Sequence, residues 1–181
     1  MPLRSRVIAL TAALCLALPV AALAADPQLR LPAFPNLERV ASNSVNLSMG
    51  RAPLALAALV LGTQDADTAE VQDLLRSLKS VSVRSYEFAA DNMYSAADVD
   101  QVREQLSAPG WNALARIKQQ QMPEAENVDV YVSTGNDDQI NGIAVVAQGA
   151  RRFTIVNIVG PIDAAKLAKL QGHFGLPSLS M

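Results

Sequence analysis

The stretch V-D-V-Y-V-S-T, residues 128–134, is the first of three strand-like runs that decide the fold of this chain. Apolar and polar residues alternate in it, as they do in a strand with one buried face. I-N-G-I-A-V-V-A-Q follows at 140–148, and F-T-I-V-N-I-V at 153–159 is apolar on both faces, which is typical of a central strand. Because short polar loops join the three runs, we expect an antiparallel meander that ends at Gly160 and Pro161.

The loop between the first two of these runs partly matches a calcium-binding motif. Asp137 and Gly142 fall on the first and sixth places of an EF-hand loop. The third and twelfth places hold Gln139 and Gln148, so the charged ligands on which calcium affinity depends are missing. Residues 135–138 are common turn formers, and we therefore expect a hairpin turn and no calcium site.

Asn157 stands out in the last, apolar run. A buried amide needs hydrogen-bond partners. We expect Asn157 to bond to the neighbouring strand or to the loop near Gly160, in a structural role.

Capping signals and helical periodicity predict four helices before residue 110. Asn36 is expected to cap the first. Pro53 opens the second, which is apolar on nearly every side as far as Gly62 and is predicted to be a central core helix rather than a partner-binding one. The third and fourth begin at capping-box patterns, at residues 67–70 and 95–98.

A last helix is predicted after residue 163, where Asp163 can cap it. Its apolar residues recur at helical spacing, and its basic residues lie on the other side. The inward set is Ala164, Leu167, Leu170 and Phe174, and the outward set is Lys166 and Lys169.

Two further strands are predicted by alternation, at 44–50 and 81–89, and residues 114–119 fit either an edge strand or a helical continuation. Consecutive strands with separate helices predict an α+β fold: an antiparallel sheet meander in the C-terminal half with helices packed on one face.

The N-terminus has the pattern of a secretory signal peptide. Arg4 and Arg6 precede a long apolar run, and the small residues before Ala25 form a cleavage site, so we expect cleavage between Ala24 and Ala25. A retained membrane anchor is the alternative. Residues 1–24 are thus assigned to the signal, 25–36 to an extended, proline-rich lead-in with Leu31 and Phe34 as candidates to dock on the body, and 37–176 to one α+β domain.

The residues after the signal have no cysteine and, with its two arginines removed, a net charge of −4 instead of −2. This mild acidity makes nucleic acid a poor partner, and no later stretch is apolar enough to span a membrane. His173 is the one histidine, so Cys–His dyads and histidine-rich zinc sites are excluded. No phosphate-binding glycine motif occurs, and we expect no metal and no cofactor.

Four segments of the second half together resemble a known family. They are W-N-A-L-A-R-I at 111–117, V-D-V-Y-V at 128–132, I-N-G-I-A-V-V at 140–146 and F-T-I-V-N-I-V-G-P-I-D at 153–163. The chain resembles the bacterial domain-of-unknown-function family 4252 over about residues 37–174. The resemblance implies an exported protein, a strand at 114–119 and a setting near extracytoplasmic sigma-factor genes. It implies no activity and no catalytic residue.

Basic and aromatic residues on several predicted strands suggest an interaction surface on the open face of the sheet. Its members are Arg84, Tyr86, Arg116, Lys118, Tyr131, Arg151 and Arg152. The competing interpretation is the ordinary polar face of a sheet whose other side is covered by helices.

Three functions fit these observations. The first is a non-enzymatic periplasmic binding or adaptor protein with an envelope protein as partner, linked to envelope stress, in contact through the sheet face or the apolar second helix. The second is a small hydrolase that uses carboxylates or a serine with His173. The third is a carrier of a small apolar ligand. The missing metal, nucleotide and thiol chemistry favours the first, so the chain is expected not to be an enzyme. Its oligomeric state is left open.

Overall fold

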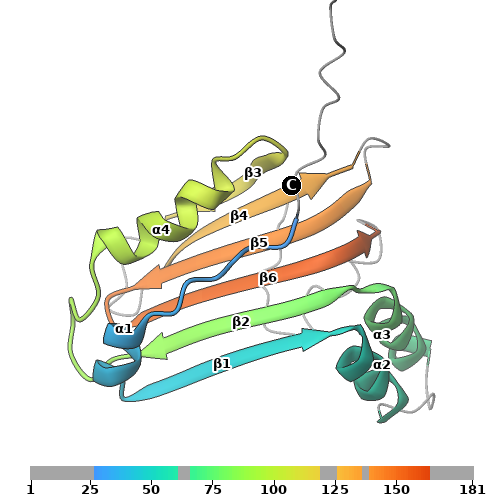
Figure 1. The fold of residues 1–181 in the computed structure, drawn as a ribbon, viewed down its shortest axis with the longest axis horizontal. Helices are drawn as coiled ribbons and strands as arrows, with labels where there is room; N and C mark the ends of the chain where they lie inside the picture. Colours follow the sequence, from blue (N-terminus) through green and yellow to red (C-terminus); the bar gives the residue numbers. More distant parts are fainter. Residues whose placement is uncertain (1–26, 61–65, 119–125, 136–138, 164–181) are drawn as a thin grey trace, which may run out of the picture.

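The computed structural model describes residues 27–60, 66–118, 126–135 and 139–163, and within them six strands form one antiparallel sheet (Figure 1). The strands lie in the order β1-β2-β6-β5-β4-β3. The bounds of the strands are β1 (Asn43–Gly50), β2 (Ser80–Glu87), β3 (Trp111–Ile117), β4 (Glu126–Thr134), β5 (Ile140–Gly149) and β6 (Arg152–Ile162). The helices are α1 (Pro35–Val40), α2 (Arg51–Val60), α3 (Ala66–Ser77) and α4 (Ala96–Leu106).

Several predicted features lie outside the described residues. They are the signal peptide with its cleavage site at Ala24 and Ala25, the hairpin tip with Asp137, the helix predicted after Asp163, and His173.

The α+β fold and the antiparallel meander are confirmed. Strands β3 to β6 pair in sequence order, and β5 and β6 occupy the middle of the sheet. Of the two interpretations of residues 114–119, the strand is correct up to Ile117, since β3 forms one edge of the sheet. At the other side, β2 pairs with β6 and β1 forms the second edge.

The expected end of β6 at Gly160 is wrong, because the strand continues to Ile162. Gly160 has a φ of +150°, and a Cβ there would lie 2.7 Å from the Cα of Leu78. The strand therefore passes the end of α3 closely, as only glycine allows. Pro161 is tolerated because β2 begins opposite Val159, so no residue of β2 pairs with the proline nitrogen.

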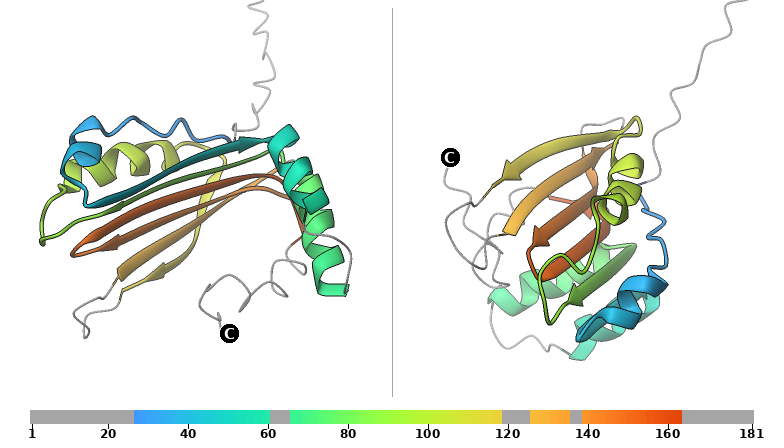
Figure 2. Two further views of the ribbon diagram at one scale, coloured as in Figure 1. Left: turned by 90° about the horizontal axis from the view of Figure 1, so that it is seen from below. Right: turned by 90° about the vertical axis from the view of Figure 1, so that its left-hand side faces the viewer.

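One face of the sheet, here named the covered face, carries the main core. Helices α1 and α4 and the lead-in at 27–34 lie on this side (Figure 2). Side chains that alternate along the strands point into it. The buried residues of this core are Leu29, Phe34, Leu37, Tyr86, Phe88, Val99, Val102, Leu106, Trp111, Tyr131, Ala144, Val146, Phe153 and Ile155.

The lead-in is extended, as predicted, but it is also packed. Phe34 is buried as a docking residue, Leu31 is partly buried, and Leu29, which the sequence did not single out, is buried as well. Asn157 fixes this segment. The amide N–H of Leu29 donates to Asn157 Oδ1 at 3.0 Å, and Asn157 Nδ2 donates to the Pro27 carbonyl at 3.1 Å.

The two helices over this face begin differently from each other. In α4, the Ser95 amide donates to Asp98 Oδ2 at 2.8 Å, as the capping-box pattern predicts. The predicted cap at Asn36 is wrong. Phe34 holds the cap position of α1, with Pro35 in the first turn, and Asn36 Oδ1 instead accepts from Arg39 Nη2 at 2.8 Å.

The other face, here named the open face, is apolar as well. The strand registers place fifteen aliphatic side chains on it, and fourteen of them are only half-buried or exposed. They are Val45, Leu47, Met49, Val81, Val83, Val156, Ile158, Ile143, Val145, Ala147, Val128, Val130, Val132, Ala115 and Ile117. An antiparallel sheet with one covered face usually presents polar residues on the other, so this face departs from the expected pattern.

Helices α2 and α3 stand together at one end of the sheet and project to the side of the open face (Figure 2). A second cluster fills the corner between them and the sheet, with Leu54, Leu78, Ile143 and Ile162 buried. The prediction that α2 is a central core helix is wrong, because only Leu54 and Ala58 of it are buried. It follows the edge strand β1 directly and has α3 as its one large helical neighbour.

Candidate functional site

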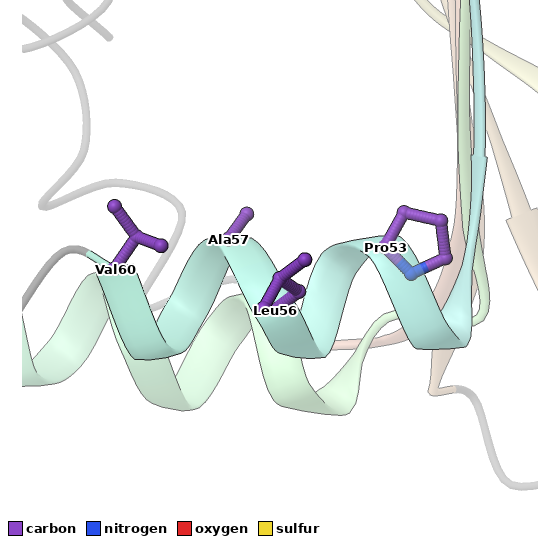
Figure 3. Close-up of a pocket in the computed structure, with 4 residues that line it drawn as sticks. All are labelled: Pro53, Leu56, Ala57 and Val60. Atoms are coloured by element: carbon purple, nitrogen blue, oxygen red, sulfur yellow. The ribbon is translucent and has the colours of Figure 1, made fainter.

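The outer side of α2 is an apolar ridge, here called the α2 ridge, formed by Leu56, Leu59 and Val60. Their exposed fractions are 63%, 66% and 80%. A shallow pocket on this side is lined by Pro53, Leu56, Ala57 and Val60 (Figure 3). Large apolar side chains that are this exposed usually mark a surface that a partner covers, because left uncovered they lower the solubility of a protein.

Local sequence explains how this ridge arises. Residues 54–60 are alanine, leucine and valine only, which favours a helix but leaves no polar side. Leu54 and Ala58, four residues apart, form the buried stripe, and the small Ala58 allows a close approach. The ridge residues lie at positions i, i+3 and i+4. This spacing is the one with which a helix enters an apolar groove of another protein.

The predicted basic and aromatic surface is not formed as expected. Tyr86 and Tyr131 are 1% and 8% exposed and belong to the core of the covered face, so they are not available to a partner. Arg84 lies on the same side of β2 as Tyr86, and its Nε is buried. The register turns Arg84, Arg116 and the two tyrosines to the covered side, whereas it places Arg152 on the open face, opposite Glu87.

Arg116 is held by a buried carboxylate. Its Nε donates to Asp129 Oδ1 at 2.9 Å, and Arg103 Nη2 of α4 donates to Asp129 Oδ2 at 2.7 Å. The side chain of Asp129 is only 4% exposed. Interactions with Tyr131 and then with Asp129 raise the pKa of Arg116, which stays charged. Lys118 follows β3 as an exposed residue. We interpret the group around Asp129 as a structural link between α4 and the sheet.

Arg151 and Arg152 pair with acids at the turn between β5 and β6. Arg151 Nε lies 2.6 Å from Asp91 Oδ1, and Arg152 lies 2.9 Å from Glu87 and 3.4 Å from Glu126. These exposed pairs contribute little to stability but cancel the positive charge locally. The sequence did not reveal the pairs, because their members are at least 26 residues apart.

Among the residues that the structure describes, no group of three or more His, Cys, Asp or Glu side chains is arranged to hold a metal ion. The neighbouring carboxylates Asp98 and Asp100 are engaged otherwise: Asp98 caps α4, and Asp100 lies 3.8 Å from Arg103 Nη1. Within the same described ranges, no helix has the length and apolarity that crossing a membrane requires.

Tyr86 is the buried titratable group with the clearest consequence. Its hydroxyl has no hydrogen-bond partner in the described part of the chain. Burial, and then the negative charge of Glu38, raise its pKa above the usual 10.0, while Arg84 lowers it. The folded protein therefore keeps this proton at a pH where the unfolded chain loses it. The stability contributed in this way is present below pH 10 and falls as the pH rises through the folded pKa.

We expect Tyr86→Phe to change the free energy of unfolding at pH 7 by no more than about 0.5 kcal/mol, because no hydrogen bond is lost. The same variant should lose less stability than the parent above pH 10. Tyr94→Phe is the comparison. The Tyr94 hydroxyl donates to the Gly149 carbonyl at 2.6 Å, so its removal should cost about 1 kcal/mol. Urea unfolding at pH 7 and pH 10.5 measures both, and a large loss in Tyr86→Phe at pH 7 would contradict this assignment.

The sequence matches one family model, Domain of unknown function (DUF4252), over residues 41–170. The chain belongs to the DUF4252 family. No curated protein matches it. The DUF4252 segment contains the α2 ridge and all six strands of the sheet, whereas the lead-in at 27–34, which completes the covered core, precedes it.

Proposed function

We propose that this DUF4252 protein is an exported bacterial binding protein that acts without catalysis by docking the α2 ridge onto a protein of the cell envelope. The observation that carries the proposal is the exposure of Leu56, Leu59 and Val60 on one side of a regular helix. A ridge of this kind offers apolar contact area and no reactive group. Binding is therefore the activity that it supports best.

The chemistry of the ridge limits the partner. The charged residue of α2 is Arg51, at its first position, and the rest of the helix is uncharged. An apolar groove that accepts side chains at i, i+3 and i+4 is complementary to it. A charged or strongly polar partner surface would lose hydration without compensation.

The cellular setting rests on the sequence. The signal-like N-terminus supports export to the periplasm, and the resemblance noted above supports an envelope-response role. A carrier function would need an apolar cavity under α1 and α4. That space is filled by the side chains of Leu29, Phe34 and Phe153, so the carrier has less support than the binding protein.

We test the proposal by site-specific photocrosslinking in cells. A photoreactive residue at Leu56 or Val60 is expected to capture one envelope protein. The same residue at Asp73 of α3 or Glu104 of α4, both exposed positions, should not capture it. Equal capture at all four positions, or none at the ridge, would contradict the proposed contact.

A substitution then measures the contact. Leu59→Glu places a charge in the ridge and is expected to weaken binding to the captured partner by about 2 kcal/mol, roughly thirtyfold. Leu114→Glu is the matched control, since Leu114 is 59% exposed on β3 and distant in sequence from α2. The affinity of the Leu114→Glu variant for the partner should equal that of the parent. Titration calorimetry with the purified partner separates the two outcomes.

A further inference from the structure

The open face is an apolar feature that the proposed function does not use. Val45 and Leu47 are 46% and 39% exposed, and most of the face is half-buried. The charged residues that the registers place on this side, Glu87, Arg152 and Glu126, lie at the end of the strands away from α2 and α3, and Arg152 pairs with both acids. Soluble proteins rarely leave an apolar area of this extent uncovered.

The open face is closed at one end. Helix α3 turns Leu74 and Leu75 toward the sheet, where they pack with Leu78 and Ile162 in the corner cluster. Figure 2 shows α2 and α3 standing away from the sheet on this side. The corner itself is filled by this cluster, and beyond it the aliphatic side chains of the open face stay half-buried or exposed.

The described chain leaves β6 in this corner. Ile162 is 3% exposed, and the next residue, Asp163, is exposed to solvent. Residues 164–174 carry apolar side chains at helical spacing, with Lys166 and Lys169 on the opposite side. As a helix they would be about 16 Å long, enough to cross three or four strands spaced about 4.8 Å apart.

We propose that residues 164–174 form an amphipathic helix that docks on the open face, with Leu167, Leu170 and Phe174 against the aliphatic side chains of β6, β5 and β4. This segment needs no linker to reach the face. Its tether gives it a local concentration that a separate molecule does not have. The inference goes beyond the proposed function: it assigns the open face to the protein's own chain and leaves the α2 ridge for the partner.

Thiol labelling tests this inference in residues 25–181, which contain no natural cysteine. A cysteine at Val145 reports access to the open face, and one at Ser133, which is 1% exposed on the covered face, reports global unfolding. Leu167→Gln with Leu170→Gln is expected to speed labelling at Val145→Cys by at least about tenfold, because two buried apolar contacts are lost. The matched pair Lys166→Gln with Lys169→Gln should change it less than about twofold.

Two outcomes of the labelling overturn the inference. One is equal labelling of Val145→Cys in both double variants. The other is protection that weakens on dilution, which would mean that a second copy covers the face. Faster labelling of Ser133→Cys would show that the leucine variant unfolds. Docking of the helix is then tested by a second measurement that needs no destabilising substitution.

That measurement uses a nitroxide on Lys169→Cys in the otherwise unchanged chain. The docked helix is expected to broaden the methyl signals of Val130 and Val145 much more than those of Val99 and Val102 in α4, on the far side of the sheet. Equal broadening of the two groups, or none, overturns the proposal.

Discussion

Asn157→Asp is expected to lower the free energy of unfolding by about 3–5 kcal/mol at pH 7. Asn157 is 0% exposed. Its Nδ2 donates to the carbonyls of Pro27 and Ile143, at 3.1 and 3.3 Å. A carboxylate of the same shape has no hydrogen to donate, so it would be a buried charge that faces two carbonyl oxygens. The lead-in would also lose its hydrogen bond at the Pro27 carbonyl, although the Leu29 amide can still donate to the carboxylate.

The effect should depend on pH in a defined direction. Burial raises the folded pKa of an introduced aspartate above its unfolded value of about 3.9. The variant therefore recovers stability relative to the parent below about pH 4 and loses it as the pH rises. Asn46→Asp is the control, because Asn46 is exposed on the edge strand β1. In chemical unfolding, the free energy of unfolding of Asn46→Asp should differ from that of the parent by no more than about 0.5 kcal/mol. Comparable losses in the two variants would refute the role assigned to Asn157.

Gly160→Ala is expected to destabilise the protein by about 2–4 kcal/mol. A Cβ at this position would lie 2.7 Å from Leu78 Cα, 3.0 Å from Lys79 N and 3.1 Å from the Ser77 carbonyl oxygen. These atoms are backbone, so they cannot move aside as a flexible side chain does. The φ of +150° adds strain for any residue with a side chain. Separation of the end of α3 from β6 would also open the corner cluster.

Gly50→Ala provides the matched control for this prediction. A Cβ there would have nothing within 4 Å. Alanine should be tolerated to within about 1 kcal/mol, and the reduced freedom of the unfolded chain works in its favour. Thermal unfolding of the two variants, measured side by side, gives the difference in their stability. A Gly160→Ala variant as stable as Gly50→Ala would mean that β6 and α3 do not approach each other as closely as described.

Residues near each other in the chain were predicted well. The three runs after residue 128 form β4, β5 and β6, joined in sequence order as short loops require. The capping box at Ser95 opens α4, and Asn157 does bond to the neighbouring strand, at Ile143. Each of these features depends on side-chain alternation, loop length or a local hydrogen-bonding pattern, all of which are present in a short window of sequence.

The candidate site was predicted less well. The sequence showed that α2 is apolar on nearly every side, and burial in the core was the natural interpretation. Its exposure follows from the position of β1 at the edge of the sheet, which leaves α2 with α3 as its main support. In the same way, the basic surface depended on which side of each strand faces outward. A shift of one residue reverses that side, and only the pairing of strands fixes it.

By itself, the sequence determined the four helices before residue 110, the strands and the antiparallel meander, because local periodicity and turns specify these features directly. Membership of the DUF4252 family also follows from the sequence alone, through its match to the family model. Only the tertiary structure decided that β1 and β2 extend the sheet beyond β6, that the lead-in completes the covered core, and that an aliphatic face and the α2 ridge remain exposed. These outcomes depend on contacts between residues far apart in the chain. The energy of such contacts comes from the burial of whole faces, which no single segment encodes.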